Sequence, residues 1–205
     1  PVVMISGATR NHTEATVRAL SLGAVDYILK PATAYDQAAR LRIARRVFSA
    51  ASSTVQVNEK ISKPAPKVVA PADTGPPPVV VIGASTGGVA ALETVMQSLD
   101  PCGPPVVVVQ HMPGPFLVSF STQLNRHLAQ DVGLAREEEV LRPGQIRLAP
   151  AEGALTLIIR QGAQRSCRIL VGDENTLYCP SVDALFSSAV PYGPDVIAVI
   201  LTGLG

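Results

Sequence analysis

Short apolar runs alternate with amphipathic stretches through much of the chain. The continuous runs Val79–Ile82, Val106–Gln110 and Val196–Leu201 have the length of buried strands. Helical periodicity follows the first two runs, over about 89–99 and 116–128. Continuous Val and Ile runs that alternate with helices are typical of a parallel sheet covered on both faces. The pattern therefore predicts an α/β fold with a mostly parallel, doubly wound sheet from residue 79 onward.

Residues 135–171 have a different pattern. Turn signals at 142–145 and 161–162 separate short apolar runs, which predicts an antiparallel insertion in the parallel sheet. After this insertion, Ser181 is placed to cap a helix over 182–190.

The first 50 residues repeat the alternation on a smaller scale. Strands are expected over Val2–Ile5 and Val25–Leu29, and Asn11 with Glu14 resembles a capping box for the helix between them. A second helix is expected to bury an apolar stripe formed by Ala38, Leu41, Ala44, Val47 and Phe48. Its other face carries Arg40, Arg42, Arg45 and Arg46, and we expect that face to be solvated, with a docking surface as the alternative. Two βα units cannot close a stable core alone, so we expect a fragment that lacks the start of this unit.

A proline-rich segment separates the two units. Six of the 18 prolines fall between Pro64 and Pro78, which favours extended backbone over helix or central strand. We therefore expect a partial domain over residues 1–50, a linker over 51–78 and a C-terminal domain over 79–205. Charge follows this division, because all the lysines lie before residue 76.

Composition argues against several classes of function. A net charge of +1, no Trp and 4% aromatic residues argue against nucleic-acid binding. No apolar run approaches the roughly 18 residues of a membrane-spanning helix, and no signal peptide is visible. The three cysteines lack metal-ligand spacing, so we expect no disulfide framework, no metal, no cofactor and a cytoplasmic location.

The turn after Val79–Ile82 carries a candidate nucleophile. The segment 83–88, Gly-Ala-Ser-Thr-Gly-Gly, contains the Gly-x-Ser-x-Gly pattern of a nucleophile elbow, with Ser85 at its centre. The N–H groups that open the next helix could stabilise an oxyanion. A phosphate-binding loop or a plain tight turn is the alternative, although the loop lacks both a P-loop lysine and Gly-x-Gly-x-x-Gly spacing.

A histidine follows the next strand, one βα repeat later. Since the carboxyl ends of neighbouring parallel strands meet at one edge, His111 should approach Ser85 and act as its general base. A loop histidine that only forms hydrogen bonds is the alternative. Asp195 precedes its strand and lies at the wrong edge, and Asp183 is expected to interact with a helix dipole. We expect the acid that orients the histidine just beyond Gly205.

Other titratable residues are expected to be structural or solvated. The acidic run Glu137–Glu139 is expected to form a solvated loop or strand edge rather than a metal site. His12 and His127 are expected on solvent-facing helix surfaces.

Four segments together resemble the catalytic domain of the chemotaxis protein-glutamate methylesterases. They are VVIGASTGG at 80–88, QHMP at 110–113, PSVDALF at 180–186 and LTG at 201–203. The first 50 residues resemble the second half of a flavodoxin-like response-regulator receiver domain. In that resemblance Ser6 matches the switch Ser/Thr, Tyr27 the switch aromatic, and Lys30-Pro31 a Lys-Pro pair whose peptide is usually cis.

The resemblance implies hydrolysis of glutamate methyl esters on the cytoplasmic helices of chemoreceptors, and deamidation of particular receptor glutamines. It implies that Ser85 is the nucleophile, His111 the base and Thr86 an active-site residue beside the serine. The family's triad aspartate would fall two residues after Gly205, and the phosphoacceptor aspartate before Pro1, so neither is present in this sequence. A histidine kinase would be the phosphodonor, and phosphorylation would relieve occlusion of the esterase cleft.

Some positions depart from the family pattern. Leu204 replaces a usual Met, Ala154-Leu155 stand where a His-Met pair is common, and Tyr178-Cys179 replace a basic stretch. These positions are expected at the rim of the cleft, where they bear on substrate choice. A nucleotide- or phosphate-binding α/β module and a catalytically silent signalling homologue are the alternative interpretations.

Overall fold

The computed structural model describes residues 1–7, 9–30, 37–52, 78–159, 165–171 and 179–202. In chain order, its elements are β1 (Val3–Ser6), α1 (Arg10–Ser21), β2 (Asp26–Leu29), α2 (Gln37–Ser52), β3 (Val79–Ala84), α3 (Gly88–Gln97), β4 (Val106–Gln110), α4 (Gly114–His127), β5 (Asp131–Leu134), β6 (Gln145–Leu148), β7 (Gly153–Ile159), β8 (Arg165–Val171), α5 (Val182–Ala189), a 3₁₀ segment (Val190–Asp195) and β9 (Val196–Ile200).

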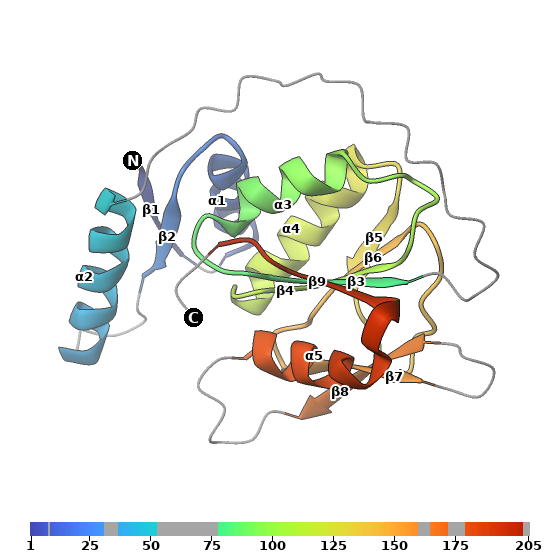
Figure 1. Ribbon diagram of the computed structural model, residues 1–205. Coiled ribbons are helices and arrows are strands. Elements are labelled where there is room, and N and C mark those ends of the chain that lie inside the picture. Colours follow the sequence, from blue (N-terminus) through green and yellow to red (C-terminus); the bar gives the residue numbers. More distant parts are fainter. Residues whose placement is uncertain (8, 31–36, 53–77, 160–164, 172–178, 203–205) are drawn as a thin grey trace.

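A five-stranded parallel sheet forms the centre of the molecule, in the order β5-β6-β4-β3-β9. Helices α3 and α4 cover one face, and α5 with the β7–β8 hairpin covers the other (Figure 1). Both helices on the first face bury residues at helical spacing, such as Leu92 and Met96 of α3, and Phe116, Phe120 and Leu124 of α4. The predicted mostly parallel α/β fold is confirmed.

The antiparallel part is smaller than the sequence suggested. β6 pairs in parallel with β4 and with β5, so residues 145–148 belong to the main sheet. Within the described residues, β7 and β8 form the antiparallel pair of strands. The turn signal at 142–145 is present, but it leads into a parallel strand, because a turn motif does not fix the direction of pairing. The turn expected at 161–162 lies outside the described residues.

The strand at 196–201 was expected to be buried, and this prediction is wrong within the residues that the structure describes. β9 pairs with β3 at the end of the strand order. Ile197 and Ile200 are 50% and 74% exposed. An apolar run indicates a strand, but it does not indicate whether that strand has neighbours on both sides.

The N-terminal βαβα unit, from β1 to α2, lies beside the carboxyl edge of the large sheet (Figure 1). β1 and β2 form a parallel pair, and α1 packs against α3 and α4. Leu20 and Tyr27 therefore belong to the same buried cluster as Leu92 and Phe116.

The expected capping box on α1 is wrong. The N-cap residue is Thr9, without a side-chain capping hydrogen bond, and Asn11 is the second residue of the helix. The pattern of Asn followed three residues later by Glu is therefore present, but it begins two residues inside the helix.

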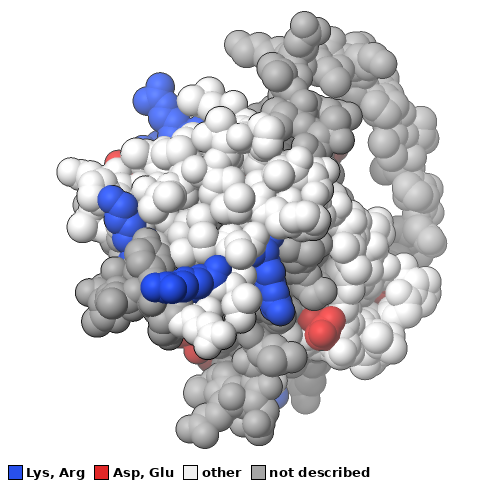
Figure 2. All heavy atoms as spheres, turned by 90° about the vertical axis from the view of Figure 1, so that its left-hand side faces the viewer, with Lys and Arg blue, Asp and Glu red and all other residues white. Residues whose placement is uncertain are grey.

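Helix α2 presents a different face from the one predicted. Leu41, Val47 and Phe48 are exposed, whereas Arg46 is partly buried and Ala50 fully buried. The reason is that α2 packs on β2 through the face that carries Ile43, Arg46 and Ala50. Arg40, Arg42 and Arg45 are exposed as expected, and the side of the molecule that carries α2 shows mainly basic charge (Figure 2).

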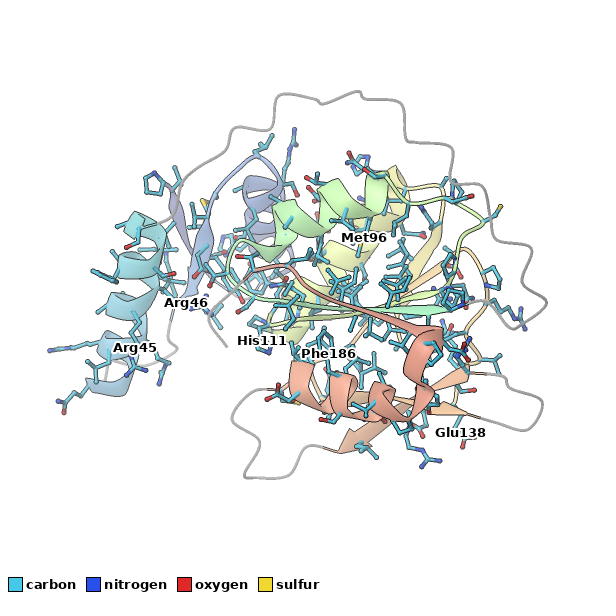
Figure 3. All side chains as sticks on the ribbon, viewed as in Figure 1. Arg45, Arg46, Met96, His111, Glu138 and Phe186 are labelled. Carbon is cyan, nitrogen blue, oxygen red and sulfur yellow. The ribbon has the colours of Figure 1, made fainter. Side chains whose placement is uncertain are left out.

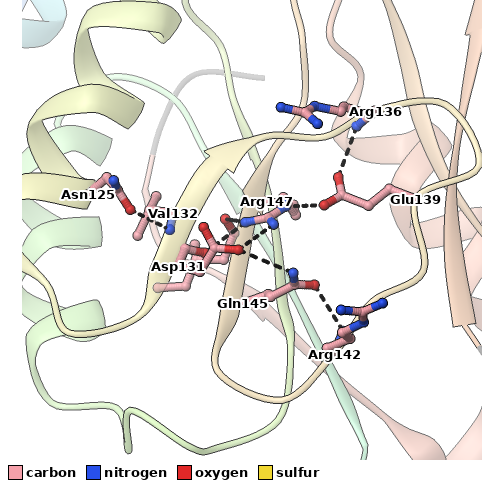
Figure 4. Close-up of polar contacts among 9 residues, drawn as sticks. Asn125, Asp131, Val132, Arg136, Glu139, Arg142, Gln145 and Arg147 are labelled. Carbon is pink, nitrogen blue, oxygen red and sulfur yellow. Dashed lines mark hydrogen bonds and ion pairs between the residues drawn. The ribbon is translucent and has the colours of Figure 1, made fainter.

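In the acidic run at 137–139, Glu137 and Glu138 are exposed in a loop, as expected, whereas Glu139 is partly buried and forms an ion pair. Arg147 of β6 is 7% exposed, and its guanidinium forms ion pairs with Glu139 at 2.7 Å and Asp131 at 2.6 Å (Figure 4). Hydrogen bonds from Arg147 hold the pKa of the Asp131 carboxyl below its usual value. Glu137 Oε2 accepts a hydrogen bond from the Ile169 N–H at 2.6 Å. The run therefore ties the loop before β6 to the sheet and to β8. Within the described residues, no cluster of His, Cys, Asp and Glu could hold a metal ion.

Across the ranges that the structure describes, no helix combines the length and apolar character needed to cross a bilayer.

Candidate active site

Ser85 stands in a tight turn between β3 and α3. Gly87, with φ of 75°, is the N-cap of α3, and the Gly88 N–H donates to the Ser85 carbonyl at 2.8 Å. A Cβ at Gly88 would overlap the Gln110 side chain and lie 2.9 Å from Ala84 Cβ. A positive φ and close backbone approach are conditions that glycine meets without strain. The Gly-rich sequence is thus needed to place the serine hydroxyl at the end of the strand.

His111 reaches the same edge of the sheet. Ala84, the last residue of β3, is paired with Gln110, the last residue of β4. Ser85 and His111, which follow them, therefore leave the two strands at the same level. The His111 N–H donates to the Ala84 carbonyl at 3.0 Å. Ser85, Thr86 and His111 line one pocket, so the structure brings together the three residues singled out from the sequence.

Burial lowers the pKa of His111 below its usual value, and the Asp183 charge partly opposes this effect. The neutral imidazole is therefore favoured at neutral pH, and this is the form that accepts a proton from a serine hydroxyl.

Gln110 also belongs to the site, although the sequence analysis assigned it no role. It is 2% exposed, and its Nε2 donates to the Ser85 carbonyl at 2.9 Å. A polar residue at the end of an otherwise continuous Val run is the signal that marks it.

The N-terminal unit completes the pocket through Asp26, Tyr27 and Arg46. The Gly87 N–H donates to the Val25 carbonyl at 3.2 Å, and Thr86 Oγ1 donates to Asp26 Oδ2 at 3.4 Å. The backbone and side chains on both sides of the pocket are therefore in direct contact.

Arg46 organises the part of the pocket contributed by the N-terminal unit. Its Nη1 lies 3.0 Å from Asp26 Oδ1 and donates to the Tyr27 carbonyl at 2.6 Å. Its guanidinium carbon lies 5.2 Å from the centroid of the Tyr27 ring, which stacks on Phe116 of α4 with a centroid distance of 4.8 Å. Burial raises the pKa of Tyr27 to about 12 and raises that of Asp26, although Arg46 opposes the second effect.

Asp26 and Arg46 were missed because the arginine was assigned to a solvated helix face. The spacing of Ile43, Arg46 and Ala50 was the available signal, since these positions share one side of a helix.

The other predicted switch residues lie outside this pocket's lining. Ser6 is buried, its Oγ accepts a hydrogen bond from Thr16 Oγ1 at 2.7 Å, and its carbonyl accepts one from the Lys30 N–H at 2.8 Å. The Lys30 side chain is exposed. The structure therefore brings Ser6 and Lys30 together at the ends of β1 and β2, while Tyr27 alone of the three lines the pocket. The peptide between Lys30 and Pro31 lies outside the described residues.

On the opposite side of the sheet from α3, helix α5 begins beside the end of β3, where Val182 contacts Gly83. Ser181 Oγ accepts a hydrogen bond from the Ala184 N–H at 3.2 Å, as the predicted cap requires. Asp183 is exposed and its charge acts on His111, so the expected interaction with the helix dipole is not its whole effect.

The positions that depart from the family pattern have different surroundings. Ala154 and Leu155 of β7 are buried, and Cys179 is exposed near the charge of Glu152. Leu204 and Tyr178 lie outside the described residues, as does the carboxylate expected after Gly205.

Comparison with known proteins identifies the family. The model of the CheB methylesterase family matches residues 80–205. The chain belongs to the CheB methylesterase family. Over its full length it is 40% identical to protein-glutamate methylesterase/protein-glutamine glutaminase 1 of Caulobacter vibrioides and 39% identical to the protein of that name from Xanthomonas campestris. It covers 60% and 61% of these two CheB relatives.

A solved structure agrees with this assignment to the CheB family. The Thermotoga maritima CheB methylesterase catalytic domain is 34% identical to the chain, with a TM-score of 0.59. The match covers 64% of this chain and 70% of that structure.

Proposed function

We propose that the protein hydrolyses glutamate methyl esters on the cytoplasmic part of chemoreceptors, and deamidates receptor glutamines, with Ser85 as nucleophile and His111 as general base. The observation that carries this proposal is the pairing of Ala84 with Gln110, because it sets Ser85 and His111 side by side at one pocket. The names of the CheB relatives, protein-glutamate methylesterase/protein-glutamine glutaminase, support a protein glutamate ester and a protein glutamine as substrates.

The proposed reaction passes through an acyl-enzyme. Ser85 Oγ attacks the ester carbonyl while His111 accepts its proton, and the protonated histidine returns that proton to the departing methoxide to give methanol. Water, deprotonated by His111, then attacks the acyl-serine, and His111 returns that proton to the departing Ser85 Oγ; the glutamate side chain leaves and loses its own proton to solvent as a carboxylate. With a glutamine side chain the leaving group is ammonia. Thr86 lines the same pocket, and the acid that orients His111 is expected after Gly205.

We assign the N-terminal unit, residues 1–50, to the second half of a receiver domain that regulates residues 79–205 through the linker at 51–78. Support comes from its position, because Val25, Asp26 and Tyr27 lie against the nucleophile turn. The Val25 carbonyl accepts the N–H of Gly87, one of the donors at the start of α3. Phosphorylation of the receiver by a histidine kinase, sensed through Ser6, Tyr27 and Lys30, would loosen these contacts and admit substrate.

Ser85→Ala in the full-length protein tests the nucleophile. Release of methanol from methylated receptor should fall about 10⁴-fold or more, since triad members act as one unit. His111→Gln should lower the rate severely as well, and adding Ser85→Ala to it should cause little further loss. Ser98→Ala, which removes an exposed hydroxyl at the end of α3, is the matched control and should retain activity.

Three results would contradict the proposal. Multiplying losses in the double variant would show that Ser85 and His111 act independently. Thermal stabilisation by nucleotides, without labelling of Ser85 by a serine-directed phosphonate, would instead favour a nucleotide-binding module. Labelling without ester hydrolysis on any methylated receptor would favour a silent homologue.

A further inference from the structure

Helix α5 is docked with its first turn against the strand that carries the nucleophile. A Cβ at Gly83 would lie 2.5 Å from Val182 Cγ1, so the backbone of β3 and the first residue of α5 are in direct contact. Ser181 fixes the start of the helix through its hydrogen bond with the Ala184 N–H. Because Val182 packs on Gly83, two residues before Ser85, this contact also sets the position of the next residue of the helix, Asp183.

The residues of α5 on either side of Asp183 pack against the sheet near its carboxyl edge, Val182 at Gly83 and Phe186 in the buried cluster. Phe186 lies three residues after Asp183, on the same side of the helix, and packs against the buried cluster that includes Val81 and Val109. Figure 3 shows His111 at the end of the sheet nearest the N-terminal unit, and Phe186 below it on the side of α5 that faces the sheet. The first turn of α5, which carries the exposed Asp183, therefore lies against the end of β3, one strand away from the end of β4 that His111 follows.

We propose that Asp183 is a positioning residue that acts through His111, its carboxylate stabilising the imidazolium that forms when Ser85 loses its proton. This inference rests on the proposed role of His111 as base. It assigns Asp183 a role separate from that of the orienting acid expected after Gly205, because Asp183 approaches from α5 on the opposite side of the sheet from α3 and α4.

Other charged and titratable groups lie around the pocket that His111 lines. From the N-terminal unit, Asp26 and Arg46 line the same pocket but form an ion pair with each other at 3.0 Å, and Tyr27 is neutral at physiological pH. Glu152 faces Cys179 and the start of α4. Among the described residues, Asp183 is the group whose charge raises the pKa of His111 against the lowering caused by burial.

The test is Asp183→Asn in the full-length protein, with Glu152→Gln as the control that also removes one exposed carboxylate from the rim. Removing the carboxylate leaves burial unopposed, so the pKa of His111 should fall further in Asp183→Asn. The acid limb of kcat/KM against pH should then move to lower pH. The plateau should fall about two- to fivefold, the range for an exposed charge pair, through kcat rather than KM. Glu152→Gln should change neither the limb nor the plateau.

The His111 ring titration, followed by NMR, separates this inference from the proposed function. An unchanged titration in Asp183→Asn, or an equal loss of activity at all pH values with an unmoved acid limb, would overturn the role of Asp183. A lowered titration would support it even if Ser85→Ala retained full activity and the proposed reaction failed. Asp183→Glu should restore the wild-type pH profile if the charge is what matters, and its failure to do so in a folded protein would also contradict the role.

Discussion

Gly83 is the position at which helix α5 packs directly against the backbone of β3. A Cβ there would lie 2.5 Å from Val182 Cγ1, closer than real Cβ contacts allow. Gly83→Ala should therefore push α5 away from β3 and lower the free energy of unfolding by about 1–3 kcal/mol. Esterase activity should fall too, because Ser85 is two residues away. Urea unfolding and methanol release measure the two effects.

Val182→Ala supplies the internal check on that prediction. Alone it leaves a small cavity, but in the Gly83→Ala background it removes the clash, so the double variant should be less destabilised than the sum of the single variants. Gly133→Ala is the control, because its added Cβ would meet only the Arg147 side chain, at 3.9 Å. Equal costs at Gly83 and Gly133 would show that the contact with α5 is unimportant.

At the scale of residues, the sequence predicted the positions of the residues that directly follow strands. Ser85 and His111 follow apolar runs one repeat apart, and parallel pairing then brings them together. Asp183, Asp26 and Arg46 could not be placed in this way, because their positions depend on how α5 and the N-terminal unit dock. Local patterns of hydrophobicity do not specify such docking.

Helices α1, α3 and α4 meet at a small polar cluster. Ser21 Oγ donates to Glu93 Oε1 at 2.6 Å, and Gln123 Nε2 donates to Ser21 Oγ at 2.6 Å and to Glu93 Oε1 at 2.9 Å. Burial raises the pKa of Glu93, and these hydrogen bonds partly oppose the rise. The cluster therefore joins α1 of the N-terminal unit to α3 and α4, and it contains a carboxylate that is costly to ionise.

Glu93→Gln should change stability in a pH-dependent way. The folded-state pKa of Glu93 is raised, so the stability contributed by its protonated form is complete below the unfolded value of about 4.5 and is lost as pH rises through the folded value. Glutamine keeps an acceptor oxygen and does not ionise. The free energy of unfolding of Glu93→Gln, relative to that of wild type, should therefore increase between pH 4 and pH 7. Parallel pH curves would contradict this prediction, and Glu138→Gln controls for the loss of one exposed negative charge.

At the scale of elements, the sequence predicted most helices and strands but not all their environments. The apolar runs gave β3 and β4, and the Ser181 cap gave the start of α5. The apolar stripe of α2 was predicted to be buried, yet the helix packs through Arg46 and Ala50. A stripe shows which face a helix could bury, and the available neighbour, here β2, decides which face it does bury.

At the scale of the molecule, the N-terminal unit lies across the site through several kinds of contact. The backbone of Val25 is hydrogen-bonded to Gly87, and Tyr27 is stacked on Phe116. Arg46 holds both strand residues in place, by its ion pair with Asp26 and its hydrogen bond to the Tyr27 carbonyl. The sequence predicted two units, but no local pattern predicted that their contact would be made at Ser85.

Arg46→Ala should therefore open the site. Without the guanidinium, the buried Asp26 carboxylate loses its ion pair, and an unpaired buried charge weakens the packing around it. The rate at which a serine-directed phosphonate labels Ser85 in the full-length protein should rise about fivefold, the factor that corresponds to roughly 1 kcal/mol. Arg45→Ala is the matched control, since Arg45 is the exposed neighbour of Arg46 on α2, and Figure 3 shows both side chains. Labelling of Arg46→Ala at the wild-type rate, or an equal rise in Arg45→Ala, would show that this contact does not restrict access. Ser85→Ala should not be labelled, which would establish that the phosphonate reacts at Ser85. Because the labelling reaction needs no receptor, its rate measures access to the site separately from recognition of the substrate.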